Sequence, residues 1–112
     1  MTKAWRPVSS VWTGGTNELL KFKGARVRVA RTCSPLLNDP TARTPPKQVS
    51  LPAGRVGILT EARMLDIYVA FLNDATAQVT SRDALLRTPK EVFAVRLNWP
   101  TFKAQFEIEI PD

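Results

Sequence analysis

Cationic and aromatic residues are interspersed near the start of the chain, in a combination suited to binding single-stranded nucleic acid. The set comprises Lys3, Trp5, Arg6, Trp12, Lys21, Phe22 and Lys23. Lysine and arginine neutralise phosphates, and flat aromatic rings stack on bases. One alternative is that Trp5 and Trp12 fasten this segment to the rest of the protein, because burial of their large apolar area is favourable in itself. A third interpretation is that the segment docks into a partner protein.

A second group of cations follows directly. It consists of Arg26, Arg28 and Arg31, with Arg55 on the next predicted strand and Lys21 and Lys23 upstream. Arg26 and Arg28 are two residues apart in an alternating segment, so they share one face of a strand. Such a group could follow a phosphate backbone. The alternative is a solvated outer face.

Positive charge is concentrated in the first half of the chain. The 112 residues carry 16 Lys and Arg and 10 Asp and Glu, a net charge of +6. Residues 1–56 hold ten cations against two acids, and residues 57–112 hold six against eight, so the halves carry +8 and −2. A basic excess of this kind favours an anionic partner, either nucleic acid or an acidic protein surface. A basic surface that is merely solvated is the alternative.

The residues that usually perform catalysis are scarce. The chain has no histidine, which excludes imidazole chemistry and most zinc sites. Its one cysteine, Cys33, excludes an intrachain disulfide, and without a neighbouring base we expect an inert thiol. Glu107, Glu109 and Asp112 could pair as acid and base or hold magnesium, but Glu107 and Glu109 fall on the polar face of a predicted strand, where we expect solvated charges. We therefore predict no enzymatic activity, no cofactor and no metal.

Hydrophobic alternation indicates the elements that must position these residues. We expect strands at residues 26–32, 48–51, 55–60, 66–72 and 76–80, and one helical turn at 81–86. The almost continuously apolar 66–72 segment predicts a strand covered on both faces. Residues 17–23 fit a short helix and a short strand equally well. The proline-rich stretch 33–48 predicts an irregular loop.

The C-terminal segment has the most regular pattern. Nine residues alternate in sidedness from Phe102 to Ile110, and Phe93, Val95 and Leu97 share a face before it. A turn at residues 98–101 would pair Leu97 with Phe102, Val95 with Ala104 and Phe93 with Phe106, which places every apolar residue on one side. Trp99 would then lie at a hairpin tip, where it either folds back over Phe102 or contacts a second subunit. The final strand could remain an edge and support a homodimer.

The middle of the chain resembles the Src-homology-3-like small barrels, including the KOW-like subset. The resemblance covers residues 23–86 and rests on four segments, KGARVRVAR (23–31), LPAGRVGILTE (51–61), DIYVAFLND (66–74) and VTSRDALL (79–86). Gly57 suits the bend at which a strand of such a barrel changes sheet. The resemblance implies a domain that binds nucleic acid, ribosomes, peptides or sibling subunits. The proline-rich first loop and the added C-terminal hairpin depart from the usual pattern.

These observations define the expected protein. We predict an all-β fold, a small partly open Src-homology-3-like barrel with an added C-terminal β-hairpin and one short helical turn. Residues 1–16 would form an extended basic and aromatic arm, and residues 17–112 the single barrel domain. No apolar run is long enough to span a bilayer or form a signal peptide, and a lone cysteine suits the cytoplasm. The expected function is non-enzymatic binding of an anionic partner, nucleic acid first; the alternative is an interaction, inhibitor or assembly module within a larger complex.

Overall fold

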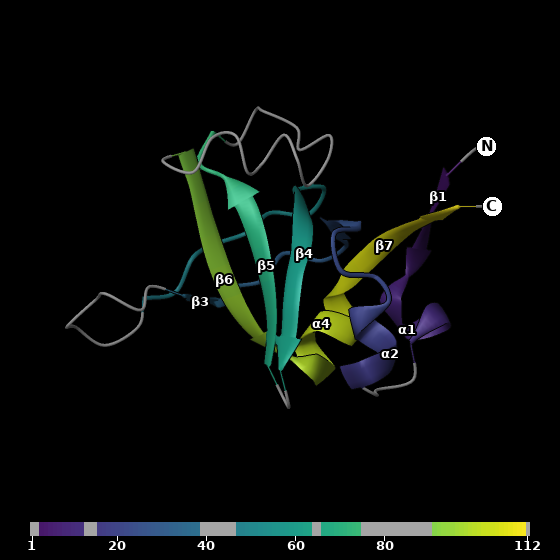
Figure 1. Ribbon diagram of the computed structural model, residues 1–112. Helices are drawn as coiled ribbons and strands as arrows, with labels where there is room; N and C mark the ends of the chain where they lie inside the picture. The colour runs from purple at the N-terminus through teal and green to yellow at the C-terminus, as the bar shows by residue number, and fades with distance from the viewer. Residues whose placement is uncertain (1–2, 13–15, 39–46, 64–65, 75–90, 112) are drawn as a thin grey trace.

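The fold is a single antiparallel sheet with short helices, seen in a computed structural model. The structure describes residues 3–12, 16–38, 47–63, 66–74 and 91–111. Within these residues, seven strands follow the order β1-β7-β2-β4-β5-β6-β3, and the sheet that they form is open and ends at β1 and β3 (Figure 1). The predicted all-β class is confirmed at this level.

The strands and helices have the following bounds. The strands are β1 Lys3–Pro7, β2 Arg26–Val29, β3 Leu36–Leu37, β4 Val56–Arg63, β5 Asp66–Leu72, β6 Val92–Asn98 and β7 Phe106–Pro111. The helices are α1 Val8–Val11, α2 Thr16–Leu20 and α4 Trp99–Gln105. The predicted strands at 26–32, 55–60 and 66–72 correspond to β2, β4 and β5, and α2 resolves the open choice at 17–23 in favour of a helix. The strand predicted at 76–80 and the helical turn predicted at 81–86 lie outside the described residues.

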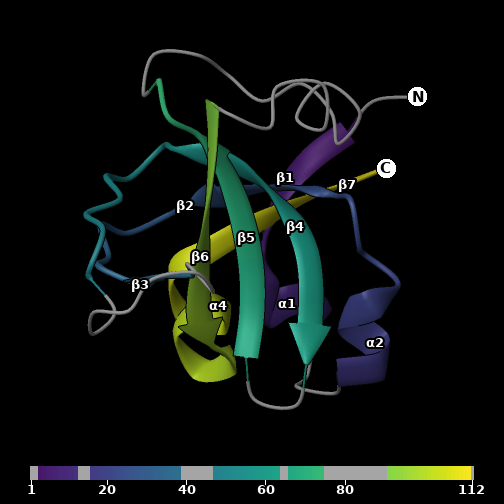
Figure 2. The same cartoon turned by 60° about the vertical axis from the view of Figure 1, so that its left-hand side comes forward.

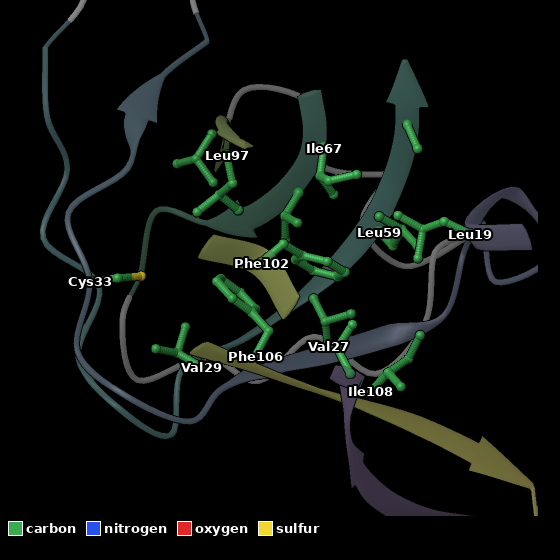
Figure 3. Packing of buried hydrophobic residues seen from close by; sticks show 14 of the residues in the cluster. Leu19, Val27, Val29, Cys33, Leu59, Ile67, Leu97, Phe102, Phe106 and Ile108 are labelled. Carbon is green, nitrogen blue, oxygen red and sulfur yellow. The ribbon is translucent and has the colours of Figure 1, made fainter. Parts of the chain in front are cut away.

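The main core lies between the twisted sheet and the helices. Figure 2 shows β4, β5 and β6 side by side, with β2 and β7 crossing behind them. Alternate residues of the strands face this core, as Val27 and Val29 do on β2. In Figure 3, Phe102 of α4 and Phe106 of β7 lie at the centre of the labelled side chains. The helices thus cover an apolar face that would otherwise meet water.

Strand β5 is buried on its core face but only partly covered on the other, so the predicted burial on both faces holds only in part. Ile67, Val69 and Phe71 face the main core. On the opposite face, Ala70 packs with Ile58 of β4 in a smaller cluster. Tyr68 and Leu72, on the same face as Ala70, are only half-buried, so this second face is covered less completely than the core face.

The predicted C-terminal hairpin is wrong. Strand β6 pairs with β5 and β3, while β7 pairs with β1 and β2, and the residues between them form α4. The side chain of Asn98 caps this helix, since its Oδ1 accepts a hydrogen bond from the backbone N–H of Thr101 at 2.9 Å. Pro100 lies in the first turn of the helix, where backbone N–H groups have no acceptor within the helix. The N–H that proline lacks therefore costs no hydrogen bond here. Phe102 is consequently buried by helical rather than strand geometry, and Ala104 is exposed.

Residues 3–12 belong to the folded domain and are not a separate arm. Strand β1 pairs with β7 along its whole length, from Lys3 opposite Pro111 to Pro7 opposite Glu107. Trp12, which follows α1, is 1% exposed. The predicted boundary at residue 16 is therefore wrong for this segment.

The first part of the predicted proline-rich loop pairs irregularly with residues 48–51. Cys33 bridges to Leu51 and Leu36 bridges to Gln48. The strand predicted at 48–51 is thus reduced to isolated bridges, because the prolines around it limit the supply of backbone donors. Residues 39–46 lie outside the described residues.

Gly57 is required by close packing and not by an unusual dihedral angle. A Cβ atom at this position would lie 2.6 Å from the carbonyl oxygen of Ala70 and 2.8 Å from the ring of Phe71. Gly54, in contrast, has a φ of +94° in the turn before β4, a conformation in which glycine is favoured. The close approach of β5 to β4 therefore accounts for glycine at this position.

Replacement of Gly57 by alanine should destabilise the protein. The added methyl group must displace the β5 backbone or the Phe71 ring, and overpacking of this kind costs about 1–3 kcal/mol. Urea unfolding measures the free energy. The control Ser50→Ala, at an exposed position, should change it by less than about 0.5 kcal/mol. Equal stabilities of the two variants would contradict the packing argument.

Loss of the Asn98 cap should weaken α4. Asn98→Ala removes the acceptor for the Thr101 N–H and should lower the free energy of unfolding by about 1 kcal/mol. Asn98→Asp keeps an acceptor and places a negative charge at the helix start, so it should retain the wild-type value. Chemical denaturation of both variants is the measurement, and an equal loss in both would show that the cap does not hold the helix.

Candidate functional site

Trp5 and two arginine–glutamate pairs form a cluster on the outer face of the sheet. The register brings Trp5 of β1 opposite Glu109 of β7, and Glu107 of β7 opposite Arg28 of β2. Arg26 Nη1 lies 3.2 Å from Glu109 Oε2, and Arg28 Nη2 lies 2.9 Å from Glu107 Oε1. The two guanidinium carbons lie over the Trp5 ring, 5.5 and 4.6 Å from its centroid. We call these five residues the Trp5 cluster.

The Trp5 cluster changes the interpretation of both predicted charge groups. Arg26 and Arg28 are half-buried and already paired, so phosphates would have to displace carboxylates to reach them. Glu107 and Glu109, expected to be solvated charges, are instead the partners of these arginines. Cations over the ring also occupy a position in which a base would stack. Asp112, the third member of the predicted acidic strip, lies outside the described residues.

Arg55 stabilises the interior and is not part of a basic patch. Its guanidinium carbon lies 5.7 Å from the centroid of the Phe71 ring and 5.5 Å from that of Phe93. The same group donates a hydrogen bond to the carbonyl oxygen of Leu72. The structure therefore separates Arg55 from the cations with which the sequence grouped it.

The remaining tryptophans pack against each other. Trp12 and Trp99 meet edge to face with ring centroids 6.2 Å apart, and Trp12 makes a similar contact with Phe102. Trp99 is half-buried at the start of α4 and does not lie at a hairpin tip. Of the predicted alternatives, packing against the core accounts for Trp12 and Trp99.

Four cations of the N-terminal half remain exposed without an ion pair among the described residues. They are Lys21, Lys23, Arg31 and Lys47. Lys21 and Lys23 lie in the turn after α2, where the N–H of Phe22 donates to the carbonyl oxygen of Leu19 at 2.9 Å. Phe22 packs against the core between them, so the two lysines extend outward. Arg6 is also exposed, and the side chain of Lys3 lies outside the described part.

A groove of about 530 Å³ lies between the segment before β3, the end of β6 and α4. Its polar lining includes Ser34, Asp66, Arg96, Thr101 and Gln105. Gln105 Oε1 is buried without a hydrogen-bond partner, which ordinarily costs about 1–3 kcal/mol. Sequence reasoning missed this groove because its walls come from three separated segments with no shared motif.

Cys33 also lines the groove but is poorly suited to nucleophilic chemistry. Burial raises the pKa of the Cys33 thiol above its ordinary value, so the thiol is protonated at neutral pH. Figure 3 shows its sulfur directed toward the apolar interior. This geometry fits the expected inert thiol.

The described residues contain neither a metal-binding cluster nor a helix suited to a bilayer. No group of three or more Cys, Asp or Glu side chains lies close enough within these residues to hold a metal ion. Among the helices of this part of the chain, none is long and apolar enough to cross a membrane. Comparisons with known protein families, with characterised proteins and with solved structures find no match to this chain.

A double-mutant cycle should detect the pairing of Arg28 with Glu107. We expect the variants Arg28→Gln and Glu107→Gln, singly and together, to show a coupling of about 0.2–1 kcal/mol at low salt. High salt should reduce this coupling, because screening shortens the range of charge interactions between partly exposed groups. Urea unfolding at two salt concentrations gives the value. A coupling of zero at low salt would mean that the ion pair contributes nothing to stability.

Proposed function

We propose that this protein is a non-enzymatic binding module that contacts an anionic partner, with nucleic acid as the first candidate. The observation that carries the proposal is the set of exposed, unpaired cations among the described residues of the N-terminal half, namely Lys21, Lys23, Arg31 and Lys47. Such side chains can release counterions from a phosphate backbone on contact. The net charge of +6 would also speed the encounter with any anionic partner.

The contact surface in this proposal is narrower than the sequence predicted. Arg26, Arg28 and Arg55 take structural roles, and Trp12 is in the core. Three of the four exposed cations border the two ends of β2, with Lys21 and Lys23 before it and Arg31 after it, whereas Lys47 lies beside Leu37 of β3. They could follow a phosphate backbone along this strand.

The resemblance to Src-homology-3-like small barrels over residues 23–86 remains part of this proposal. Antiparallel pairing of β2 with β4, and of β4 with β5, supports it. The open strand order fits a partly open barrel, which β1 and β7 extend at one edge. In the same proposal the protein acts in the cytoplasm, where a single buried thiol persists in reduced form.

The Trp5 cluster favours a second candidate function, binding of another protein. Tryptophan and arginine are among the residues most enriched where interfaces gain most of their affinity. Trp5, Arg26 and Arg28 place tryptophan and arginine together on one sheet face. Trp5 itself belongs to β1, the strand at the open edge. The partner would be another protein within a larger complex or a second copy of this chain.

The nucleic-acid proposal predicts steep salt dependence with contributions from Lys21 and Lys23. A mixed-sequence fluorescent single strand and the matching duplex, titrated by anisotropy at several salt concentrations, should both bind at low salt. The double variant Lys21→Gln/Lys23→Gln should weaken binding. It should also lower the log–log salt slope on duplex by about 0.9 for each phosphate that is no longer neutralised.

A matched control removes the same charge elsewhere. Arg63→Gln/Lys103→Gln changes the net charge equally in the C-terminal half and should leave the salt slope as in the wild type. Absence of wild-type binding to both nucleic acids at low salt would contradict this function. If Trp5→Ala, and not the lysine variant, abolishes co-purification of a protein partner, the second candidate is correct.

A further inference from the structure

The groove beside α4 exists because two backbone segments separate. The β3–β6 pairing consists of Leu36 opposite Arg96 and Leu37 opposite Val95. Continued in the same register, this pairing would place Ser34 opposite Asn98, but no such pair forms in the described sheet. Cys33 instead exchanges two backbone hydrogen bonds with Leu51, of 3.0 and 2.8 Å, while Asn98 begins α4. The groove is the space left between these diverging walls.

Opposite charges line this groove without pairing to each other. Asp66 of β5 lies opposite Asn98 of β6, two residues from Arg96, so Asp66 and Arg96 are diagonal neighbours on one sheet face. Diagonal neighbours have Cα atoms about 7–8 Å apart. Both side chains are half-buried, and neither has an ion pair with any described residue.

Gln105 adds an amide oxygen that no described residue satisfies. This atom, Oε1, is buried and without a hydrogen-bond partner. Rotation about the last side-chain bond exchanges the amide oxygen and nitrogen, so Gln105 can offer either an acceptor or a donor. The hydroxyl groups of Ser34 and Thr101 belong to residues of the same lining.

We propose that the groove binds a small zwitterion with one carboxylate and one ammonium group, of the size of a free amino acid or a dipeptide. Arg96 pairs with the carboxylate through its planar guanidinium, and Asp66 pairs with the ammonium, which also donates to Gln105. Leu36, which is half-buried and lies opposite Arg96, provides apolar surface for the side chain of the ligand. The volume of about 530 Å³ falls in the range of small-molecule sites, about 300–1,000 Å³.

Charge complementarity favours a zwitterion over a simple anion or a simple cation. A simple anion such as phosphate would be attracted by Arg96 but repelled by Asp66, and a simple cation would meet the reverse arrangement. A molecule that carries both charges satisfies the two side chains together. The site shares no residue with the exposed cations proposed to contact nucleic acid, so it stands independently of that function.

The direct test is a nuclear magnetic resonance titration of the uniformly ¹⁵N-labelled full chain. The probes are the proteinogenic L-amino acids and a set of glycine-containing dipeptides. At least one probe should shift amide resonances of residues 33–36 and 96–105 in a saturable manner. N-acetylation or C-amidation of that probe should each weaken binding about tenfold, because each removes one charge-assisted contact.

Variants and controls keep the outcome decisive. Arg96→Gln and Asp66→Asn should each weaken binding of the probe about tenfold, whereas Glu18→Gln, at an exposed position on α2 outside the groove lining, should leave the dissociation constant unchanged. Retained dispersion of the amide spectrum shows that each variant is folded, and Asp66→Asn serves alone if Arg96→Gln unfolds. The proposal is overturned if no probe shifts these resonances, if the neutralised derivatives bind equally well, or if inorganic phosphate alone binds as tightly.

Discussion

The contacts of Trp12 with Trp99 and Phe102 join the two ends of the chain to one core. Trp12 follows the first strand, and the other two rings belong to α4, which leads into the last strand. These three rings hold α1 and α4 together on the inner face of the sheet. Strand β7 can then pair with β1 on one side and β2 on the other. The Trp5 cluster exists only because this pairing places its five residues side by side.

Local periodicity was sufficient for strands whose neighbours lie close along the chain. Strands β2, β4 and β5 were predicted because their apolar residues follow a strand period or fill a continuous run. The helix α4 was missed because Phe102 and Phe106 satisfy both periods, being four residues apart and also on one face of a strand. The side-chain hydrogen bond of Asn98 decides between these alternatives, and the sequence pattern carries little trace of it. Pro100, at a position that suits the first turn of a helix, was the available signal.

The candidate site was predictable in composition but not in pairing. The sequence showed that Arg26 and Arg28 share a face, and likewise Glu107 and Glu109. It did not show that these faces meet, because the partners are 83 and 79 positions apart and only the strand order brings them together. A count of positive charges therefore overstated the free basic surface. Asp66 and Arg96 present the converse case, since an acid and a base lie as neighbours without neutralising each other.

The pairing of β1 with β7 also determines how the protein responds to mechanical force. Lys3 lies opposite Pro111, so the start of β1 and the end of β7 lie beside each other (Figures 1 and 2). A force applied between these two residues acts across the strands and loads their hydrogen bonds one after another instead of all at once. The first strand would therefore peel away from the sheet at low force. As successive hydrogen bonds between β1 and β7 break, the separation would reach Trp5 first. It would then reach Trp12, whose ring contacts hold the core.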